Sequence, residues 1–318
     1  MKYYLAPLEG ITNQIFRKTY HKYFYPMDKY FTPFLAPHTK KGFTSKELKD
    51  ISPENNVGMY TVPQILTNDA EGFLITAKKL QSYGYTEVNL NLGCPSKTVA
   101  NKGRGSGFLI YPDKLEQFLD EIFSKTDMRI SVKTRIGKEN PEEFYRLLEI
   151  YNKYPMEELI IHPRIQRDFY NNHPNMEMFD LAVQESKNPI CYNGDLFTAE
   201  KIHTFSEHYP QIDCIMLGRG ILVNPELVRN YLKDEPQSKK RIRCFHDDLY
   251  EEYAKEMSGG KNVLFKMKEF WFYMIHTFKD SEKYAKQIRK CTDTKQYERI
   301  VEDIFANCEL ICLGEQEE

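Results

Sequence analysis

The sequence predicts an α/β fold, a (β/α)8 TIM barrel followed by a C-terminal helical domain. Eight short β-type runs alternate with helical patterns along most of the chain, as in a closed parallel barrel. Polar residues gather where these runs end, and such barrels carry their active sites at that edge. The length of 318 residues exceeds the ~250 of a usual barrel, so a small additional domain fits.

Helical segments lie between most of the predicted strands. Leu115, Phe118, Leu119 and Ile122 show the helical spacing most clearly. The second unit has the weakest helix, because residues 44–49 form a short one at best. The eight predicted strands span residues 3–5, 30–35, 59–66, 87–92, 129–134, 158–162, 189–192 and 214–217.

The pattern changes after Leu232. Residues 234–238 read as a linker, and amphipathic helices follow in place of strands. One helix carries Trp271 on its apolar side. A later one carries Tyr297, Cys308 and Cys312, and we expect the two cysteines to be core residues and not ligands. We therefore predict two domains, a catalytic barrel over residues 1–233 and a helical domain over residues 234–318.

Composition limits the classes of partner and compartment. The net charge is −2, so any surface that binds nucleic acid must be local. No apolar run approaches the ~18 residues that span a bilayer, and the start shows no signal-peptide pattern. The seven cysteines include no C-x-x-C pair. We expect a cytoplasmic protein with reduced thiols, no disulfide framework and no metal site.

The candidate site consists of the residues at the strand ends. Convergence of polar residues from seven such ends is harder to obtain by chance than any single motif. In chain order, the candidates are Pro7, Leu8, Glu9, Gln64, Asn91, Cys94, Lys133, Arg135, His162, Arg164, Asn193, Gly194, Asp195, Gly218 and Arg219.

The loops after the last two strands suggest a phosphate site. Gly194 and Gly218 allow backbone N–H groups to approach an anion closely, and Arg219 adds a forked charged contact. Either loop alone would fit an ordinary tight turn. Both together, followed by Arg219, favour phosphate.

Lys133 lies inside an apolar strand, where burial of its charge is costly. In the barrel mouth it could hold negative charge on a reduced cofactor ring, with Gln64 and His162 bonding a heteroaromatic ring. The alternative is a lysine on the outer face of the strand. Cys94 follows a glycine and precedes a proline at a strand end, where a thiol with a reference pKa of about 8.5 can act as an acid.

The segment 103–107 contains three glycines and looks like half of a dinucleotide fingerprint. The complete signature needs a preceding strand, a following helix and a later acidic residue, so we discount it. We expect a mobile loop near Cys94 instead. No convincing nicotinamide motif occurs elsewhere in the sequence.

Taken together, the motifs form a recognisable set. In order they are APLEGIT at 6–12, NLGCPSK at 91–97, VKTRIG at 132–137, HPR at 162–164, NGD at 193–195 and GRG at 218–220. In these motifs the chain resembles the tRNA-dihydrouridine synthases over essentially the whole barrel, and its helical tail matches the RNA-binding domain of that family in position and size.

The resemblance implies an FMN-bearing barrel that reduces the C5–C6 double bond of particular uridines in RNA, with NADPH as the reductant. Asn91 would face the uracil and Cys94 would protonate C5 as the general acid. We also expect Arg135 and Arg164 to contact the substrate. The residues that would line the flavin, contact its ring or hold its tail and phosphate are Pro7, Leu8, Glu9, Gln64, Lys133, His162, Asn193, Gly194, Asp195, Gly218 and Arg219.

The helical domain offers a candidate RNA contact. Lys279, Lys283, Lys286 and Lys290 recur at spacings of 4, 3 and 4, which places them on one helix face. A solvated face is the ordinary explanation of such a run, and the resemblance favours RNA. The chain departs from the family at Leu8, where methionine is common, and at Pro163, where glycine is common.

Other functions stay open at this point. A flavin barrel with a cysteine could methylate C5 of uridine in ribosomal RNA with a folate carbon, or it could oxidise or reduce free pyrimidines. The helical tail argues against a small substrate, and a non-enzymatic RNA-binding protein would explain none of the strand-end residues. We expect an RNA substrate, most simply tRNA, a monomer, no obligate protein partner and no membrane contact.

Overall fold

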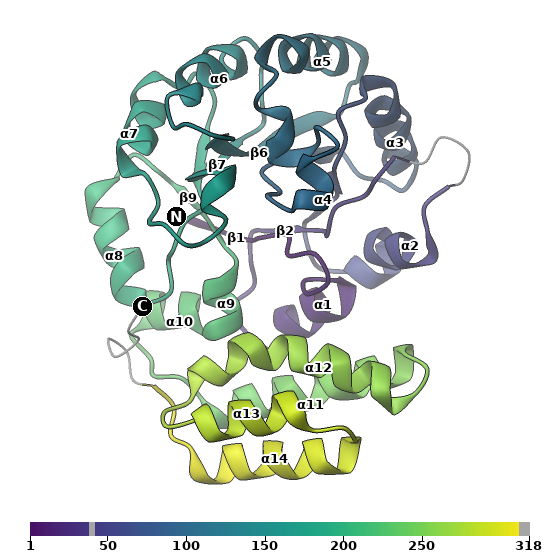
Figure 1. Cartoon of the computed structure of the whole chain (residues 1–318), viewed down its shortest axis with the longest axis vertical. Coiled ribbons are helices and arrows are strands. Elements are labelled where there is room, and N and C mark those ends of the chain that lie inside the picture. The colour runs from purple at the N-terminus through teal and green to yellow at the C-terminus, as the bar shows by residue number, and fades with distance from the viewer. Residues whose placement is uncertain (38–41, 312–318) are drawn as a thin grey trace. The chain divides into compact units, whose positions relative to one another are not determined.

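The computed structural model describes residues 1–37 and 42–311, and it confirms the α/β barrel (Figure 1). Within these residues nine parallel strands form one sheet in the order β3-β2-β1-β9-β8-β7-β6-β5-β4. The strands are β1 Lys2–Leu5, β2 Lys29–Phe31, β3 Thr61–Val62, β4 Gln64–Ile65, β5 Glu87–Leu92, β6 Arg129–Gly137, β7 Leu159–Ile165, β8 Ile190–Tyr192 and β9 Cys214–Leu217.

The two edges of this sheet meet at Pro63, which closes the barrel. β3 pairs with β2, and β4 pairs with β5, so the two short strands are one strand interrupted by a residue that has no N–H to donate. The prediction of one strand over 59–66 is wrong in this respect. The strand predicted over 30–35 is also shorter, because regular pairing ends at Phe31 and continues only as an isolated bridge between Leu35 and Ile65.

Contacts between residues divide the chain into two compact units. Unit 1 comprises residues 1–9, 28–195 and 211–216, and unit 2 comprises residues 10–27, 196–210 and 217–318. Unit 2 thus groups some helices of the barrel segment with the C-terminal helices. The boundary between residues 233 and 234 stays a prediction. None of the described helices combines the length and the apolar character needed to cross a membrane.

Unit 1 contains the strands and a series of helices outside them (Figure 1). The predicted apolar face of α5 is buried, and its Phe118 ring lies 6.0 Å from the Phe73 ring of α3. The barrel interior holds an apolar cluster that includes Tyr4, Ile160 and Cys191. The helices of unit 1 are α2 Ser45–Ile51, α3 Ala70–Ser82, α4 Lys97–Ala100, α5 Pro112–Lys125, α6 Glu143–Tyr151 and α7 Met176–Glu185, with the 3-10 turns η1 Pro53–Asn56, η2 Gly105–Phe108 and η3 Gln166–Asp168.

Unit 2 is helical. Trp271 and Tyr297 lie at its centre, where the indole Nε1–H donates to the Tyr297 hydroxyl at 2.8 Å. Phe16 stacks on Phe270 at 5.5 Å, and Cys308 is buried as expected, whereas Cys312 lies outside the described residues. The helices of unit 2 are α1 Gln14–Tyr23, α8 Ala199–His208, α9 Arg219–Val223, α10 Leu227–Lys233, α11 Lys239–Glu256, α12 Gly260–Met274, α13 Glu282–Lys290 and α14 Thr294–Asn307, with the turn η4 Ile275–Thr277.

Candidate active site

Strands β5 and β6 supply a polar wall inside the barrel. In register, Asn89 lies beside Ser131, and Asn91 lies beside Lys133. Side chains alternate between the faces of a strand, so these residues share one face while Leu90 and Val132 take the other. Asn91 and Lys133 are one pleat nearer the C-terminal ends of the strands, where a TIM barrel carries its active site.

Cys94 lies on the loop that follows β5, and Asn91 shapes this loop. The Asn91 Oδ1 atom accepts hydrogen bonds from the backbone N–H groups of Gly93 at 3.0 Å and Cys94 at 2.9 Å. The thiol is half-buried, and this burial raises its pKa, although Arg135 and Lys133 act in the opposite direction. A thiol that keeps its proton at neutral pH suits a proton donor better than a thiolate nucleophile.

The glycine-rich segment after Cys94 is the turn η2, and its residues are buried. Both the backbone N–H and the hydroxyl of Ser106 donate to the Cys94 carbonyl, at 3.2 Å and 2.8 Å. Gly105 has φ +55°, and a Cβ there would lie 2.9 Å from the same oxygen. The segment thus lies against Cys94 as expected, with a 3-10 turn over Gly105–Phe108 in place of an irregular loop, and its mobility stays a prediction.

Lys133 is a cation without a counter-ion. Among residues 1–37 and 42–311, no side chain or carbonyl forms a hydrogen bond or ion pair with its ammonium group. Burial and then the nearby Arg135 lower its pKa from 10.5 to about 8. A half-buried ammonium that lacks a partner among the described residues fits an anionic or electron-rich ligand.

Gln64 and Asn91 bind each other. The Asn91 Nδ2 donates to the Gln64 Oε1 at 2.7 Å, and the Gln64 Nε2 donates to the Asn89 Oδ1 at 2.7 Å. Gln64, predicted to contact the flavin ring, and Asn91, predicted to face the uracil, thus belong to one buried hydrogen-bond network. Asn91 already uses both ends of its amide within the protein.

Arg135 joins the loop after β5 to the end of β7 and the segment that follows it. Its guanidinium donates to the carbonyl oxygens of Gly93 at 3.1 Å, Ile165 at 2.7 Å and Phe169 at 2.6 Å. It also lies 5.4 Å from the centre of the Tyr170 ring. In this structure the group predicted to contact substrate holds the Cys94 loop against the segment that follows β7.

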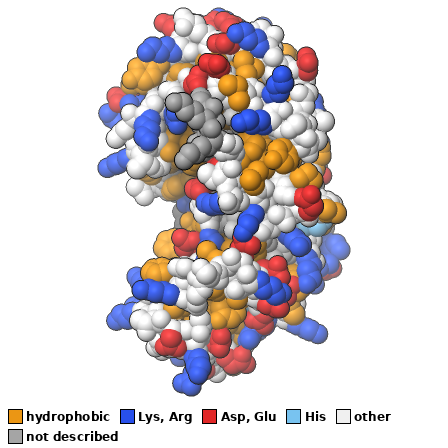
Figure 2. Space-filling model, turned by 90° about the vertical axis from the view of Figure 1, so that its right-hand side faces the viewer, with side chains coloured by type: hydrophobic (Ala, Val, Ile, Leu, Met, Phe, Trp, Pro, Cys, Tyr) orange, Lys and Arg blue, Asp and Glu red, His pale blue; other side chains and the backbone are white. Residues whose placement is uncertain are grey.

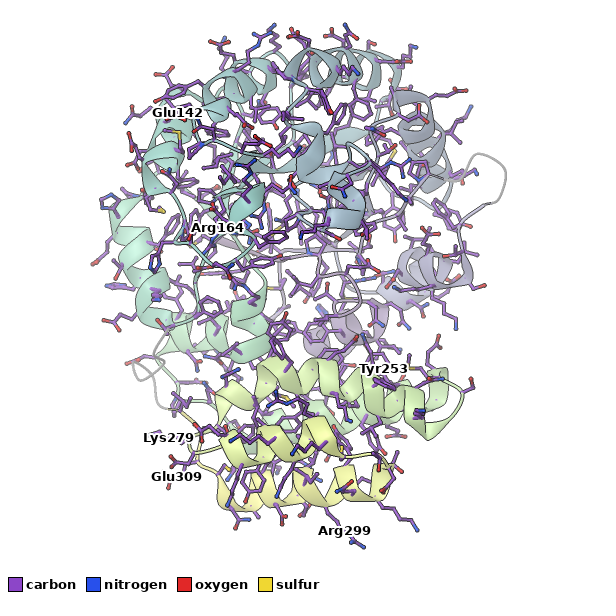
Figure 3. All side chains as sticks on the ribbon, viewed as in Figure 1. Glu142, Arg164, Tyr253, Lys279, Arg299 and Glu309 are labelled. Carbon is purple, nitrogen blue, oxygen red and sulfur yellow. The ribbon has the colours of Figure 1, made fainter. Side chains whose placement is uncertain are left out.

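Arg164 likewise serves as a clamp (Figure 3). It forms a two-pronged ion pair with Asp195, and its Nε donates to the Asn172 carbonyl at 2.5 Å. Its NH1 lies 3.0 Å from the His162 Nε2. A guanidinium can only donate, so the His162 Nε2 accepts this hydrogen bond and the proton of the neutral imidazole resides on Nδ1.

The predicted phosphate residues fall into both units. Asn193 donates to the Met216 carbonyl at 2.8 Å, and a Cβ on Gly194 would collide with the Tyr192 ring. Gly218 and Arg219 belong to unit 2, where the Arg219 guanidinium lies 5.3 Å from the centre of the Phe197 ring. The phosphate site, which needs both groups, stays a prediction.

The first loop is the most open part of the candidate site. Pro7 and Leu8 are half-buried, and Glu9 is exposed and pairs with Lys46 at 2.9 Å. This ion pair ties the loop to helix α2.

The lysine stripe lies mainly on α13. Lys283, Lys286 and Lys290 are exposed, while Tyr284 and Ile288 fill the opposite, buried side of the helix. Lys279 precedes the helix and is half-buried (Figure 3). On the face drawn in Figure 2, basic and acidic side chains are interspersed, so any RNA contact there would be local.

Sequence reasoning missed four residues of the barrel interior: Lys29, Glu87, Asn89 and Ser131. They form the part of the hydrogen-bond network that lies toward the N-terminal ends of the strands, and this network reaches Gln64 and Asn91. A signal was present, because the β5 sequence EVNLNL alternates polar and apolar residues. That alternation places a polar row on one face of a strand that is buried throughout.

The sequence model described as "Dihydrouridine synthase" matches residues 4–309. Among similar proteins is tRNA-dihydrouridine synthase B of Pasteurella multocida (strain Pm70), 29% identical over 228 residues, which cover 71% of this chain and 67% of that protein. The probable tRNA-dihydrouridine synthase of Staphylococcus aureus (strain COL) is 28% identical over 263 residues, with 79% and 78% covered.

Two solved structures share the fold at low sequence identity. The old yellow enzyme homologue from Zymomonas mobilis has a TM-score of 0.52 at 11% identity and covers 77% of this chain and 92% of its own. A mutant of morphinone reductase in complex with tetrahydroNAD has a TM-score of 0.51 at 10% identity, covering 72% of this chain and 86% of its own.

Proposed function

The chain belongs to the dihydrouridine synthase family of flavin-dependent oxidoreductases, and from that premise we propose that it reduces the C5–C6 double bond of particular uridines in tRNA to dihydrouridine, with FMN as cofactor and NADPH as reductant. The observation that carries the proposal is a pair of groups supplied by β5 and β6. Cys94, on the loop after β5, offers a thiol that keeps its proton, and Lys133, within β6, offers a cation that has no counter-ion among the described residues. Reduction of a polarised double bond needs both a proton donor and a site that tolerates negative charge.

The residues present fit FMN at the barrel mouth. Lys133 has no hydrogen-bond or ion-pair partner within residues 1–37 and 42–311, so it is available to the electron-rich edge of a flavin ring. Gln64 and His162 offer hydrogen-bonding groups from β4 and β7. Asn193, Gly194, Asp195, Gly218 and Arg219 are the candidates for the tail and phosphate, with Pro7, Leu8 and Glu9 along the first loop. Bound FMN would supply the hydride that C6 of the uracil receives.

The chain's own residues would carry out the proton transfer. The thiol of Cys94 would protonate C5 as negative charge develops there, and its raised pKa keeps the proton available at neutral pH. Asn91 and η2 hold the Cys94 backbone from two sides, which limits the positions that the thiol can take. Arg135 ties the same loop to the segment after β7.

Product analysis tests the proposal. Purified protein is incubated with NADPH, a reduced folate that carries a one-carbon unit, and tRNA that lacks dihydrouridine, and the nucleosides are analysed by mass. A uridine that gains two hydrogens supports reduction. A uridine that gains a methylene group would instead indicate C5 methylation and overturn the proposal, as would protein that neither purifies with FMN nor binds it.

The role of Cys94 is tested by Cys94→Ala, with Cys244→Ala as the matched control. Both thiols are half-buried, but Cys244 lies on α11 in unit 2. We expect Cys94→Ala to keep its flavin and its NADPH oxidation and to lose about 100-fold or more in uridine reduction, the usual contribution of a positioned acid. Full activity on RNA in this variant would remove Cys94 from the acid role.

The proposed RNA contact is the lysine stripe on α13. A variant with Lys283, Lys286 and Lys290 changed to glutamine should bind tRNA more weakly. The slope of the logarithm of its binding constant against the logarithm of the salt concentration should become shallower by about 0.7–0.9 for each lost phosphate contact. Lys114, Lys125 and Lys78, on helices of unit 1, provide a control with the same loss of charge. Equal weakening in both variants would show a net-charge effect and no specific contact. We also propose that the protein acts in the cytoplasm and as a monomer.

A further inference from the structure

A single line of hydrogen bonds runs inside the barrel from the Cys94 loop to the N-terminal end of β5. The Cys94 N–H donates to Asn91, Asn91 donates to Gln64, and Gln64 donates to Asn89, at 2.9, 2.7 and 2.7 Å. Asn89 then donates to the Ser131 hydroxyl at 3.0 Å, and this hydroxyl donates to the Glu87 carboxylate at 3.1 Å. The line joins β4, β5 and β6.

The two ends determine the direction of every bond between them. A backbone N–H such as that of Cys94 can only donate, and the Glu87 carboxylate accepts from Lys29 and Tyr60 as well as from Ser131. The amides in the middle could each be turned around in isolation. Reversing any one of them would bring two donors or two acceptors together.

The line is buried and anchored, so water cannot satisfy a hydrogen-bonding group that loses its partner there. Asn89 and Ser131 are 0% exposed, and Glu87 is 2% exposed. Lys29 holds the lower end by pairing with Glu87 at 2.9 Å and Glu158 at 3.1 Å. An unsatisfied group in such a place costs more than the bond itself contributes, so neighbouring groups reorient to avoid it.

We propose that Asn89, Ser131 and Glu87 are positioning residues for Cys94. The anchored line makes Asn91 present its oxygen, and not its NH2 group, to the N–H groups of Gly93 and Cys94. The loop then holds the thiol in place. Residues at the far end of the barrel thus determine the geometry at its mouth. This inference deepens the proposed role of Cys94 and rests on it.

Ser131→Ala tests the proposal by removing the hydroxyl that joins Asn89 to Glu87. With the line broken, the Asn89 amide loses its acceptor, and Gln64 and Asn91 lose their anchored support. The loop then loosens, so we expect iodoacetamide to alkylate Cys94 at least about fivefold faster. Peptide mass spectrometry follows Cys94 and Cys244 in the same sample, and Cys244 is the internal reference. Ser131→Thr keeps the hydroxyl and should restore the original rate.

Thr134→Val is the matched control. It removes a buried hydroxyl from the same strand, but that hydroxyl binds Tyr151 at 3.0 Å and lies on the other face of β6. Its Cys94 rate should equal that of the unmodified protein.

Glu87→Gln gives a second measurement and decides the matter alone if Ser131→Ala does not fold. Lys29 donates to both oxygens of Glu87, Ser131 to one of them and Tyr60 to the other. A glutamine offers one acceptor oxygen in place of two, so the fixed acceptor at this end of the line is weakened. Faster alkylation of Cys94 in both variants, with rescue by Ser131→Thr, supports the proposal. Unchanged rates, a change in only one variant, or the same change in Thr134→Val would overturn it. The measurement uses no RNA, so its failure is distinct from a failure of uridine reduction.

Discussion

The two ends of the barrel interior differ in how they surround a half-buried lysine. At the N-terminal end of the strands, Lys29 pairs with Glu87 and Glu158, and these carboxylates outweigh the effect of burial, so its pKa is raised. Toward the C-terminal end, Lys133 has no such partner among the described residues, and burial lowers its pKa to about 8. The lysine at the N-terminal end therefore has its charge balanced by carboxylates, whereas the charge of the lysine toward the C-terminal end is not balanced by any described residue.

This difference separates stability from function. A cation that is already paired with carboxylates is not available to bind a ligand. A cation without a partner lowers the free energy of unfolding, and a bound anionic ligand can offset that loss. TIM barrels carry stability at the N-terminal face and chemistry at the C-terminal face, and the two lysines follow that division. Substitution of the two lysines should therefore give changes of opposite sign in the free energy of unfolding.

The largest effect is expected for Lys29→Met. It leaves Glu87 and Glu158 buried together without their cation, so we expect a loss of about 3–5 kcal/mol in the free energy of unfolding. Urea denaturation measures it. Lys2→Met is the control, because Lys2 forms an exposed ion pair with Asp213 and should contribute under ~1 kcal/mol. Similar losses in the two variants would contradict the comparison.

Arg164→Met tests a clamp at the C-terminal end. Arg164 is buried, but its partner Asp195 is partly exposed and can regain water, so we expect a smaller loss of about 2–3 kcal/mol. Arg164→Lys keeps the charge but not the forked geometry, and it should recover only part of that loss. A full recovery would show that charge alone matters here.

Lys133→Met should sharpen the contrast by stabilising the protein. The depressed pKa means that the folded state holds this proton less tightly than the unfolded chain, so the penalty is complete below pH 8 and disappears toward pH 10.5. At pH 7 we expect flavin-free Lys133→Met to gain about 1–2 kcal/mol in the free energy of unfolding. FMN binding should fall by about tenfold or more. Lower stability in the flavin-free variant would show that Lys133 is satisfied in some other way.

The sequence predicts the strands and the placement of Cys94 well, because both depend on local signals. Alternation marks β5 and β6, and the Gly93–Pro95 turn marks the loop. The split at Pro63 was missed although its cause is local, since a missing N–H interrupts the pairing.

The use of the arginines was not predictable, because it depends on distant backbone. Arg135 binds carbonyls of Gly93, Ile165 and Phe169, which only the folded barrel brings together. The hydrogen-bonded line inside the barrel needs the register of three strands, and a single sequence gives none of these registers directly.

The smallest expected effect is the pH dependence of FMN affinity. With a pKa of about 8, Lys133 is mostly charged at pH 7 and mostly neutral at pH 9. Affinity should therefore fall by about threefold to tenfold as pH rises through this range, since the ammonium group loses its charge. Quenching of FMN fluorescence measures the affinity, and Lys133→Met should show no such fall. A decline of the same size in Lys133→Met would assign the pH dependence to another group, and the contrast between the two ends would then rest on stability alone.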